Sequence, residues 1–474
     1  MPEKTLPALR PSSEPAAVDL PVREALVVAS CDVLVVGGGP AGMGAALGAA
    51  AAGADVVLAE RFGFLGGNPT VALVNPLMSW HTQAAPPLSA DQLALLPQDH
   101  GPGDPVVAGA LQRFLNELLS AGGALAPTQT TGYTVPFDPE TYKLVALEAM
   151  ETAGVRVLLH AFASDVWGEP QRPSGVIFDG KSGPFVIEAR NLVDATGDGD
   201  VAARAGALFH VGREADGRVQ PMTLMFRIAD FDRSAFAAYV EAHPDQWQGV
   251  HGLTELVREA TEAGDLDLPR EDILFFATPH PKELSVNCTR VTGVLGTDVF
   301  DLTRAEIEAR RQMQQIMRFL RKYVPGFATA YVVQSGTHIG VRETRRVVGE
   351  YTLDVSDVLG GRKFEDAIAR ASYPVDIHNP EGPGTVMRRL PAGEWYEVPL
   401  RCLLPKGVEN LLVAGRCISG THEAHSSYRV TPTAMATGQA AGVCAAIAGS
   451  TGRQPRDVPA AEVQRELRRQ GAIV

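Results

Sequence analysis

The sequence has few of the features that mark metal-cluster proteins or redox-active dithiols. Only five cysteines occur among its 474 residues, at positions 31, 288, 402, 417 and 444, and no two of them are spaced as C-x-x-C. Their spacing excludes a ferredoxin-type cluster motif and a catalytic dithiol. We therefore expect buried thiols in a reducing compartment, with no metal site and no iron–sulfur cluster.

Long apolar runs and blocks of basic residues are also missing. No stretch of about 20 apolar residues is available to cross a membrane. Met1 to Arg23 contains five prolines and scattered charges rather than the apolar core of a signal peptide. The 42 basic and 55 acidic residues give a net charge of -13, which offers no electrostatic support to a polyanion. We expect a cytoplasmic protein with neither a nucleic-acid nor a membrane partner.

One stretch, Cys31 to Glu60, has the order strand, glycine turn, helix and second strand. The continuous apolar run Val33 to Val36 predicts a buried parallel strand. Gly37, Gly39 and Gly42 then follow in G-x-G-x-x-G register. The first glycine permits a tight turn, the second lets a pyrophosphate approach the backbone, and the third lets the helix pack closely on the strand.

The predicted helix runs from about Pro40 to Ala52 and offers free N–H groups and a positive dipole end to a phosphate. Glu60 ends the second strand roughly 20 residues beyond the glycines, where an acid accepts the hydroxyls of an adenosine ribose. An acid at this place disfavours a 2′-phosphate. The alternative is a glycine-rich turn of an unrelated α/β protein, which would leave Glu60 and the three glycines as coincidences.

Glycine-rich and polar segments recur along the chain. Arg61 to Thr70 predicts an irregular loop along the dinucleotide, with a plain surface turn as the alternative. Gln83 to Val107 predicts a long loop or lid. Asn191 to Asp200 predicts a short strand that ends in small residues and an acidic cluster. Gly336 to Arg346 crowds polar groups between two apolar strands.

The C-terminal part repeats the pattern of the beginning. Leu411 to Ala414 predicts a strand, which Gly415-Arg416 ends, and Pro432 to Ala448 predicts a helix of small residues. Between them, His422 to Arg429 concentrates histidine and arginine, and we expect it to be a loop that precedes the last helix.

These segments resemble the FAD-dependent oxidoreductase family, flavoproteins with the glutathione-reductase-type FAD fold that are related in architecture to fumarate reductase-like flavoproteins. The resemblance is carried by Gly37 to Gly42, Gly66-Gly67, Asp194 to Asp200, Gln220 to Met225, Gly340 to Arg346, Asn410 to Arg416 and Ala436 to Gly442. It implies an α/β fold with a Rossmann-like FAD-binding domain, an inserted α+β substrate domain, and FAD as the cofactor.

The resemblance also implies which residues hold FAD. They are Gly37, Gly39, Pro40, Ala41, Gly42, Glu60, Arg61, Gly66, Gly67, Asn68, Thr196, Gly197, Asp198, Gly415, Arg416, Thr431, Pro432 and Thr433. Arg416 stands where many relatives of the wider fold carry an acid for a ribityl hydroxyl. The last helix, near Thr431 to Thr433, is expected to direct its N-terminus at the pyrimidine end of the flavin, where its dipole stabilises negative charge.

We divide the chain into four parts. Residues 1–22 are expected to be a flexible lead-in, residues 23–205 the first part of the FAD-binding domain, residues 206–400 a substrate or cap domain, and residues 401–474 the C-terminal part of the FAD-binding domain.

Six residues near these segments are candidates for catalysis because histidine transfers protons and arginine holds carboxylates or carbonyls. They are His422, Arg429, His425, His338, Arg345 and His81, with Arg342 and Trp80 beside them in sequence. We expect an oxidoreductase that takes a hydride from a small organic substrate. A flavin-dependent monooxygenase and a non-catalytic redox-sensing flavoprotein are the alternatives, and the sequence leaves a homo-oligomer open.

Overall fold

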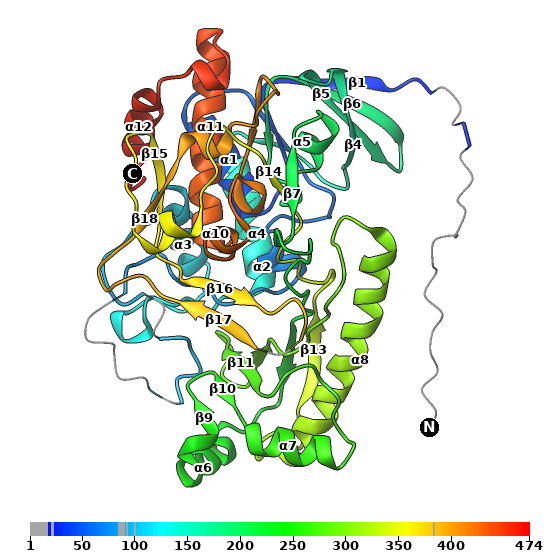
Figure 1. Ribbon diagram of the computed structural model, residues 1–474, viewed down its shortest axis with the longest axis vertical. Helices are drawn as coiled ribbons and strands as arrows, with labels where there is room; N and C mark the ends of the chain where they lie inside the picture. The colour runs from blue at the N-terminus through cyan, green and yellow to red at the C-terminus, as the bar shows by residue number, and fades with distance from the viewer. Residues whose placement is uncertain (1–17, 20–22, 84–90, 92, 99–100, 383) are drawn as a thin grey trace.

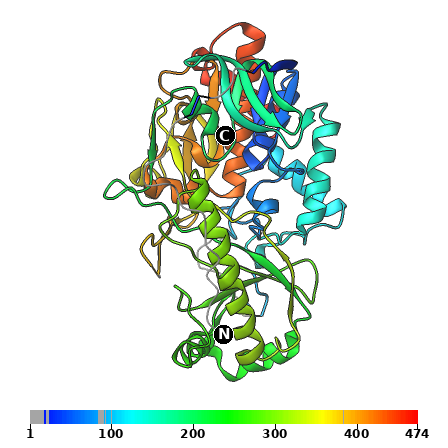
Figure 2. The ribbon, with the colours of Figure 1, turned by 90° about the vertical axis from the view of Figure 1, so that its right-hand side faces the viewer.

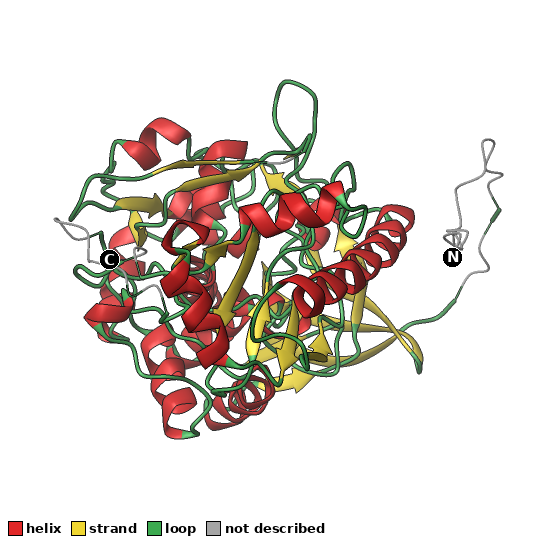
Figure 3. Cartoon of the chain, turned by 90° about the horizontal axis from the view of Figure 1, so that it is seen from below, coloured by secondary structure: helices red, strands yellow, loops and turns green. Residues whose placement is uncertain are grey.

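The computed structural model describes residues 18–19, 23–83, 91, 93–98, 101–382 and 384–474. Helices and strands occur throughout this part of the chain, so the protein is a mixed α/β structure (Figure 3). A seven-stranded sheet and a six-stranded sheet lie at opposite ends of the long axis (Figure 1). The predicted lead-in, residues 1–22, lies outside the described residues except for positions 18–19.

The seven-stranded sheet contains the predicted nucleotide-binding unit. Its parallel strands are β3 (Arg156–Leu158), β2 (Val56–Ala59), β1 (Leu26–Val36), β6 (Gly183–Asp194) and β19 (Leu411–Val413), in that spatial order. The strands β4 (Phe162–Glu169) and β5 (Arg172–Gly180) add an antiparallel excursion next to β6. A central first strand flanked by later parallel strands is the order of a Rossmann-type fold.

Two further patterns in the sequence concern this sheet. Strand patterns from Phe162 to Trp167 and from Gly175 to Asp179 predict an antiparallel pair that closes near Val186, and β4, β5 and the start of β6 confirm it. The short apolar run from Glu24 to Ser30 suggests an added edge strand, but it is instead the first half of β1 and pairs with β6 from Leu26 onward. The chain stays extended there because β6 is long enough to pair along the whole of β1.

Glycines bring the helices α1 (Pro40–Ala51) and α11 (Thr431–Thr451) into direct contact. A Cβ atom on Gly438 would lie 1.9 Å from the carbonyl oxygen of Ala41, and one on Gly442 would lie 1.9 Å from that of Ala45. The small-residue helix predicted at the C-terminus is therefore confirmed, and its glycines are explained by the backbone of α1.

The six-stranded sheet is antiparallel and forms the other end of the molecule. Its strands, in spatial order, are β13 (Tyr331–Ser335), β8 (Phe226–Ala229), β12 (Leu284–Val286), β11 (Ile273–Ala277), β10 (His251–Gly252) and β9 (Trp247–Gln248). The long helix α8 (Val299–Tyr323) runs along this sheet (Figure 2). Phe226 and Phe275 share one core with Ile316 and Leu320 of α8.

The remaining elements surround the two sheets. The helices are α2 (Asn68–Val71), α3 (Ala110–Ser120), α4 (Pro139–Thr152), α5 (Asp200–Arg204), α6 (Arg233–Ala242), α7 (Thr254–Glu262), α9 (Val355–Leu359), α10 (His422–Tyr428) and α12 (Ala460–Arg469). The strand pairs are β7 (Phe209–Val211) with β14 (Arg345–Val347), β15 (Ala367–Ala371) with β18 (Tyr396–Pro399), and β16 (Val375–His378) with β17 (Thr385–Arg388).

Local sequence signals predict some of these helices correctly and miss others. The residues Phe137-Asp-Pro-Glu140 carry an N-cap signal, and Asp138 does cap α4 by accepting a hydrogen bond from the amide of Thr141. The irregular segment expected from Arg61 to Thr70 ends in the short helix α2. The loop expected from His422 to Arg429 is wrong, because Thr421 caps a buried helix, α10, by accepting from the amide of Ala424.

Buried apolar side chains form two large cores. One core joins residues between Cys31 and Ala207 to residues between Val347 and Leu467, and the other joins Leu95 and Leu96 to residues between Met222 and Val341. Buried apolar residues between Val347 and Leu390 thus pack on the nucleotide-binding side of the molecule. The predicted domain boundaries at residues 206 and 400 stay a prediction.

Candidate active site

In the turn between β1 and α1, the fold requires glycine at two of the three G-x-G-x-x-G positions and does not require it at the other one. Gly37 has a φ angle of +99°, and a Cβ atom on Gly42 would lie 1.7 Å from the carbonyl oxygen of Gly37. A Cβ atom on Gly39 would meet only the Cα of Gly67, at 3.6 Å, which is ordinary van der Waals contact. The packing of the described residues therefore does not require glycine at position 39, whereas a pyrophosphate close to the backbone would require it.

Gly39 is also the N-cap of α1, and no side chain caps this helix. Pro40 and Ala41 form its first turn. The unpaired N–H groups and the positive end of the helix dipole suit a phosphate at this place. Gly67, with a φ angle of +57°, lies beside Gly39, and the amide of Gly66 donates to the carbonyl of Gly38 at 2.8 Å. The glycine loop and the glycine turn thus form one cradle, which fits a pyrophosphate.

Glu60 lies at the end of β2 and is buried. Its two carboxylate oxygens accept the backbone amides of Gly38, at 2.6 Å, and Phe62, at 2.8 Å. Burial raises the pKa of Glu60, while the two amide hydrogen bonds act in the opposite direction. Each oxygen keeps a lone pair that can accept a ribose hydroxyl. Arg61 is exposed, with its guanidinium 4.9 Å from the centre of the Phe62 ring.

The middle cofactor segment is tied to the C-terminal one by an ion pair. Asp198 accepts from Arg416 Nη2 at 2.9 Å and, through the same oxygen, from the Thr344 hydroxyl at 2.9 Å. Gly197 packs against Arg416, and the Thr196 hydroxyl donates to Asp194 at 2.7 Å. Arg416 stands where many relatives carry an acid, and here Asp198 supplies a carboxylate next to that position.

Arg416 keeps an unused donor in this arrangement. Its Nη1 atom is buried and has no hydrogen-bond partner within the described ranges. Arg416 and Asn68 both line the same cavity, and the Asn68 side chain donates to the carbonyl of Val341 at 3.2 Å. These are the polar groups that a cofactor extending beyond the cradle would meet.

The last helix begins in that cavity. Val430 is the N-cap of α11 and supplies no side-chain cap, while Thr431 and Pro432 of the first turn line the cavity wall. The Thr433 hydroxyl is buried with no hydrogen-bond partner in the described part of the chain. Gly415 lies close to Ala41, so the turn after β19 and the start of α1 are neighbours. A negative charge at the N-terminus of α11 is stabilised by the helix dipole.

The cavity has a volume of about 620 Å³, within the range of small-molecule sites. Its walls come from the cofactor segments, from the six-stranded sheet, and from the β16–β17 hairpin that lies between them (Figure 1). The cofactor side contributes Asn68, Arg416 and residues 430–432; the sheet contributes Met225, Leu274 and Phe276; the hairpin contributes Asp376, His378, Thr385 and Met387.

Positive charge exceeds negative charge on the cavity wall. The charged lining residues are Arg270, Arg342, Arg389, Arg416, Arg429, Asp272 and Asp376. Arg270 pairs with Asp272 at 2.9 Å, and Arg429 approaches Asp376 at 3.4 Å. Arg342 has no carboxylate partner within the described ranges. An anion is the ligand that this balance favours.

Asp376 is the centre of a hydrogen-bonded group that the sequence analysis did not find. It accepts from the Tyr373 hydroxyl at 2.9 Å and lies 3.5 Å from His378 Nε2. Burial alone would raise the pKa of Asp376, but His378, Arg429 and the Tyr373 hydroxyl hold it well below its usual range. Asp376 and His378 are two residues apart on β16, so they lie on the same face of the strand. Polar residues at alternating positions of this strand could have predicted the pair from the sequence.

His378 is held in one tautomer. Its Nδ1 lies 3.3 Å from Arg290 Nη2, and a guanidinium only donates, so Nδ1 is the acceptor and Nε2 carries the proton facing Asp376. Burial lowers the pKa of His378 to about 3, and the charge of Arg342 acts in the same direction. His378 is therefore neutral at pH 7.

The structure places the remaining candidates away from the cavity wall. His422 is buried and bonds Glu343 through Nδ1 at 2.9 Å. His425, three residues further along α10, is also buried, and burial lowers its pKa well below the ordinary value. His338 bonds the carbonyl of Ile339 at 2.7 Å. Their predicted catalytic roles stay predictions, and only Arg429 of the six candidates lines the cavity.

Arg345 and His81 also lie elsewhere. Arg345 pairs with Asp200 at 2.8 Å and donates to the carbonyl of Asp198. His81 stacks on Tyr133 with ring centroids 3.8 Å apart. These contacts suit structural roles, whereas Arg342, three residues before Arg345, lines the cavity.

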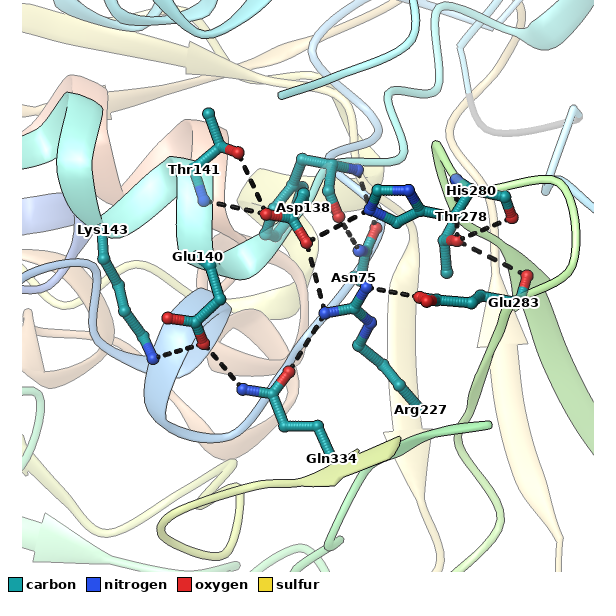
Figure 4. Close-up of polar contacts among 11 residues, drawn as sticks. Asn75, Asp138, Glu140, Thr141, Lys143, Arg227, Thr278, His280, Glu283 and Gln334 are labelled. Carbon is teal, nitrogen blue, oxygen red and sulfur yellow. Dashed lines mark hydrogen bonds and ion pairs between the residues drawn. The ribbon is translucent and has the colours of Figure 1, made fainter. Parts of the chain in front are cut away.

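A second buried charged group joins the two ends of the molecule (Figure 4). Arg227 of β8 pairs with Asp138, the N-cap of α4, and with Glu283, and it donates to the Gln334 side chain. The guanidinium is 7% exposed. Because these partners come from the N-cap of α4 and from the six-stranded sheet, the cluster links these two parts of the molecule.

Two kinds of feature are absent from the described residues. No group of three or more histidine, cysteine, aspartate or glutamate side chains is arranged to hold a metal ion. No helix in the described ranges has the length and apolar composition needed to cross a membrane.

The strand order, the glycine cradle, Glu60 and the uncapped helix N-termini define a dinucleotide-binding protein of Rossmann type. The chain matches the FAD dependent oxidoreductase family over residues 32–467 and belongs to that family. FAD is its cofactor, and the cradle at Gly39, the acid at Glu60 and the donor on Arg416 fit that molecule.

Solved structures resemble the chain only weakly, both in sequence identity and in TM-score. A geranylgeranyl bacteriochlorophyll reductase-like protein of Thermoplasma acidophilum is 14% identical, with 93% of this chain and 83% of that chain covered and a TM-score of 0.43. The myxobacterial chondrochloren halogenase CndH is 13% identical, with 93% and 79% covered and a TM-score of 0.45. The p-nitrophenol 4-monooxygenase PnpA of Pseudomonas putida is 10% identical, with 93% and 84% covered and a TM-score of 0.47. No curated protein matches the chain.

Proposed function

We propose that this FAD-dependent oxidoreductase oxidises a small organic substrate by hydride transfer to the flavin inside the 620 Å³ cavity. One observation carries the proposal. The cavity is lined both by Asn68, Arg416 and Thr431, which we expect to contact the cofactor, and by residues of the six-stranded sheet. A substrate bound there would share a single cavity with the cofactor.

Bound FAD supplies an acceptor for two electrons, so a substrate C–H bond breaks as a hydride leaves and a new C=O, C=N or C=C bond forms. The substrate also loses a proton, which passes to water. Asp376 is a carboxylate on the cavity wall, deprotonated at neutral pH, and a carboxylate with so low a pKa is a weak base. We therefore assign Asp376 to holding Arg429 in place rather than to taking the proton. Tyr373 and His378 hold the orientation of Asp376 through their hydrogen bonds.

The N-terminus of α11 contributes electrostatically. Its free N–H groups and dipole favour the negative charge that accumulates at the cofactor end of the cavity. Oxygen, a quinone or a carrier protein would then take the two electrons and reoxidise the flavin. We further propose that the protein works in the cytoplasm on a small molecule, without a nucleic-acid or membrane partner.

The test is anaerobic flavin bleaching. Purified protein with its FAD is mixed with a panel of small organic acids, alcohols and amines, and separately with NADH and NADPH, while the flavin absorbance is followed. Bleaching by an organic compound alone supports the proposal. Bleaching by NADH or NADPH alone, with oxygenation of a substrate in air, indicates a monooxygenase. A flavin that only dithionite reduces indicates a redox sensor.

A further inference from the structure

Arg342 differs from the other arginines of the cavity whose partners the structure describes. Its Nη1 donates to the carbonyl of Pro221 at 2.7 Å and to the Thr223 hydroxyl at 2.7 Å, and both acceptors are neutral. Arg270, Arg416 and Arg429 each have an aspartate partner instead. Among the described residues no carboxylate pairs with Arg342, so its charge is left for a ligand.

The geometry leaves part of the guanidinium available. Because Nη1 makes both protein hydrogen bonds, Nη2 and Nε are unbonded within the described part of the chain. Burial lowers the pKa of Arg342 to about 9, with Arg429 adding to the effect, so the group remains charged at neutral pH. Two fixed bonds orient the group, and planar donors of this kind match a carboxylate.

Another part of the cavity wall is apolar. Met225 and Phe276, with Leu73, form a small cluster that is separate from both main cores, and Leu274 packs against it. Val74 and Met387 also line the cavity, and their side chains are 37% and 43% exposed. Large apolar side chains that remain exposed inside a cavity are positioned for contact with a ligand.

Resting on the proposed function, we infer that the substrate is a small monocarboxylic acid with an apolar body. Its carboxylate binds Arg342, and its aryl or branched alkyl part lies on Met225, Leu274 and Phe276. A sugar would leave its hydroxyls facing these side chains without partners, at a cost in desolvation. A short dicarboxylate would place its second charge on the same apolar surface.

Binding to the oxidised holoprotein tests the inference without catalysis. The probes are benzoate, phenylacetate, 3-phenylpropionate and hexanoate, each compared with its neutral amide, and acetate and succinate are included as acids without an apolar body. Affinity is measured by calorimetry and by the change in the flavin absorption spectrum. We expect at least one apolar acid to bind roughly 10- to 100-fold more tightly than its amide, the scale of a charged hydrogen bond.

The variant Arg342→Met should reduce the affinity for that acid to the level of the amide, and Arg342→Lys should restore part of it. The matched control is Arg388→Met. Arg388 lies on β17 next to Met387, but side chains alternate along a strand, and Arg388 does not line the cavity. This control should bind the acid as the unaltered protein does, and FAD content with the melting temperature checks that each variant is folded.

Three results would overturn the inference: every amide binds as tightly as its acid, Arg342→Met binds the acid unchanged, or succinate binds best. If Arg342→Met does not fold, the comparison of acids with amides in the unaltered protein decides. If acids bind through Arg342 but no reduced or hydroxylated acid bleaches the flavin, the proposed oxidation fails while the inference stands. If only neutral compounds bind and bleach the flavin, the inference fails while the oxidation stands.

Discussion

The backbone amide of Gly38 donates to the carboxylate of Glu60 at 2.6 Å, which joins the two ends of the nucleotide-binding unit. The same acid also accepts from the amide of Phe62. Glu60 is thereby fixed beside the glycine turn, with lone pairs left for a ribose. The acid that we expect to bind the adenosine ribose is therefore held in place by the protein's own hydrogen bonds.

Gly39 should be essential for cofactor binding and dispensable for folding. The protein itself leaves room for a Cβ atom there, so we expect Gly39→Val to fold and to lose FAD, because its side chain occupies the place of the pyrophosphate. Flavin content per chain and the circular dichroism spectrum measure the two effects. Gly39→Ala is the milder control. A Gly39→Val protein that purifies with stoichiometric FAD would refute this assignment.

Arg429 and Arg345 should behave differently, although sequence alone made both of them candidates for substrate binding. Arg429 lines the cavity, so Arg429→Met should slow flavin reduction by roughly 100-fold while FAD content stays nearly intact. Arg345 pairs with Asp200 outside the cavity wall, so Arg345→Met should change that rate far less. Stopped-flow measurement of flavin reduction distinguishes them, and equal slowing in both variants would restore the original expectation.

His81 should make stability depend on pH. Burial lowers its pKa from 6.5 to about 4, so between these values the unfolded chain binds a proton that the folded chain does not. Stability contributed by the neutral ring is thus lost as the pH falls through this window, by about 2 kcal/mol between about pH 7 and about pH 5. Urea unfolding at both pH values should show a smaller loss for His81→Phe than for the unaltered protein. An identical pH dependence would argue against this account.

Arg227 should stabilise the link between the two ends of the molecule. Arg227→Met leaves Asp138 and Glu283 without their guanidinium, and we expect the free energy of unfolding to fall by about 2 kcal/mol. Arg453→Met removes a more exposed ion pair to Glu462 and serves as the control, with little change expected. Both variants should retain FAD. Equal stability of the two variants in urea would contradict the role of the cluster.

The five cysteines should be unreactive in the folded protein. All are free and buried, and burial raises the pKa of Cys31 to about 12 and that of Cys288 to about 11. A chromogenic disulfide reagent should therefore react slowly until urea exposes the thiols. Activity should survive dithiothreitol, and iron analysis should be negative. Loss of activity on reduction would reveal an essential disulfide.

Much of the nucleotide-binding half was predictable because its signals are local. The apolar strand, the glycine turn and the alanine-rich helix follow one another within Cys31 to Glu60, and their hydrogen bonds form between neighbouring elements. The helix α10 was not predictable in this way. Its sequence, His422–Tyr428, carries little helical periodicity, and most of its side chains are buried by distant segments.

The sequence by itself therefore determined the family, the cofactor and the position of the cradle, since contiguous residues set these features. The tertiary structure alone decided which charged residues meet in the cavity. Arg342 and Arg345 are three residues apart, yet only Arg342 faces the cavity, and Asp376 reaches it from another hairpin. Which arginine acquires a carboxylate partner depends on segments far apart in the chain, and no local pattern specifies that pairing.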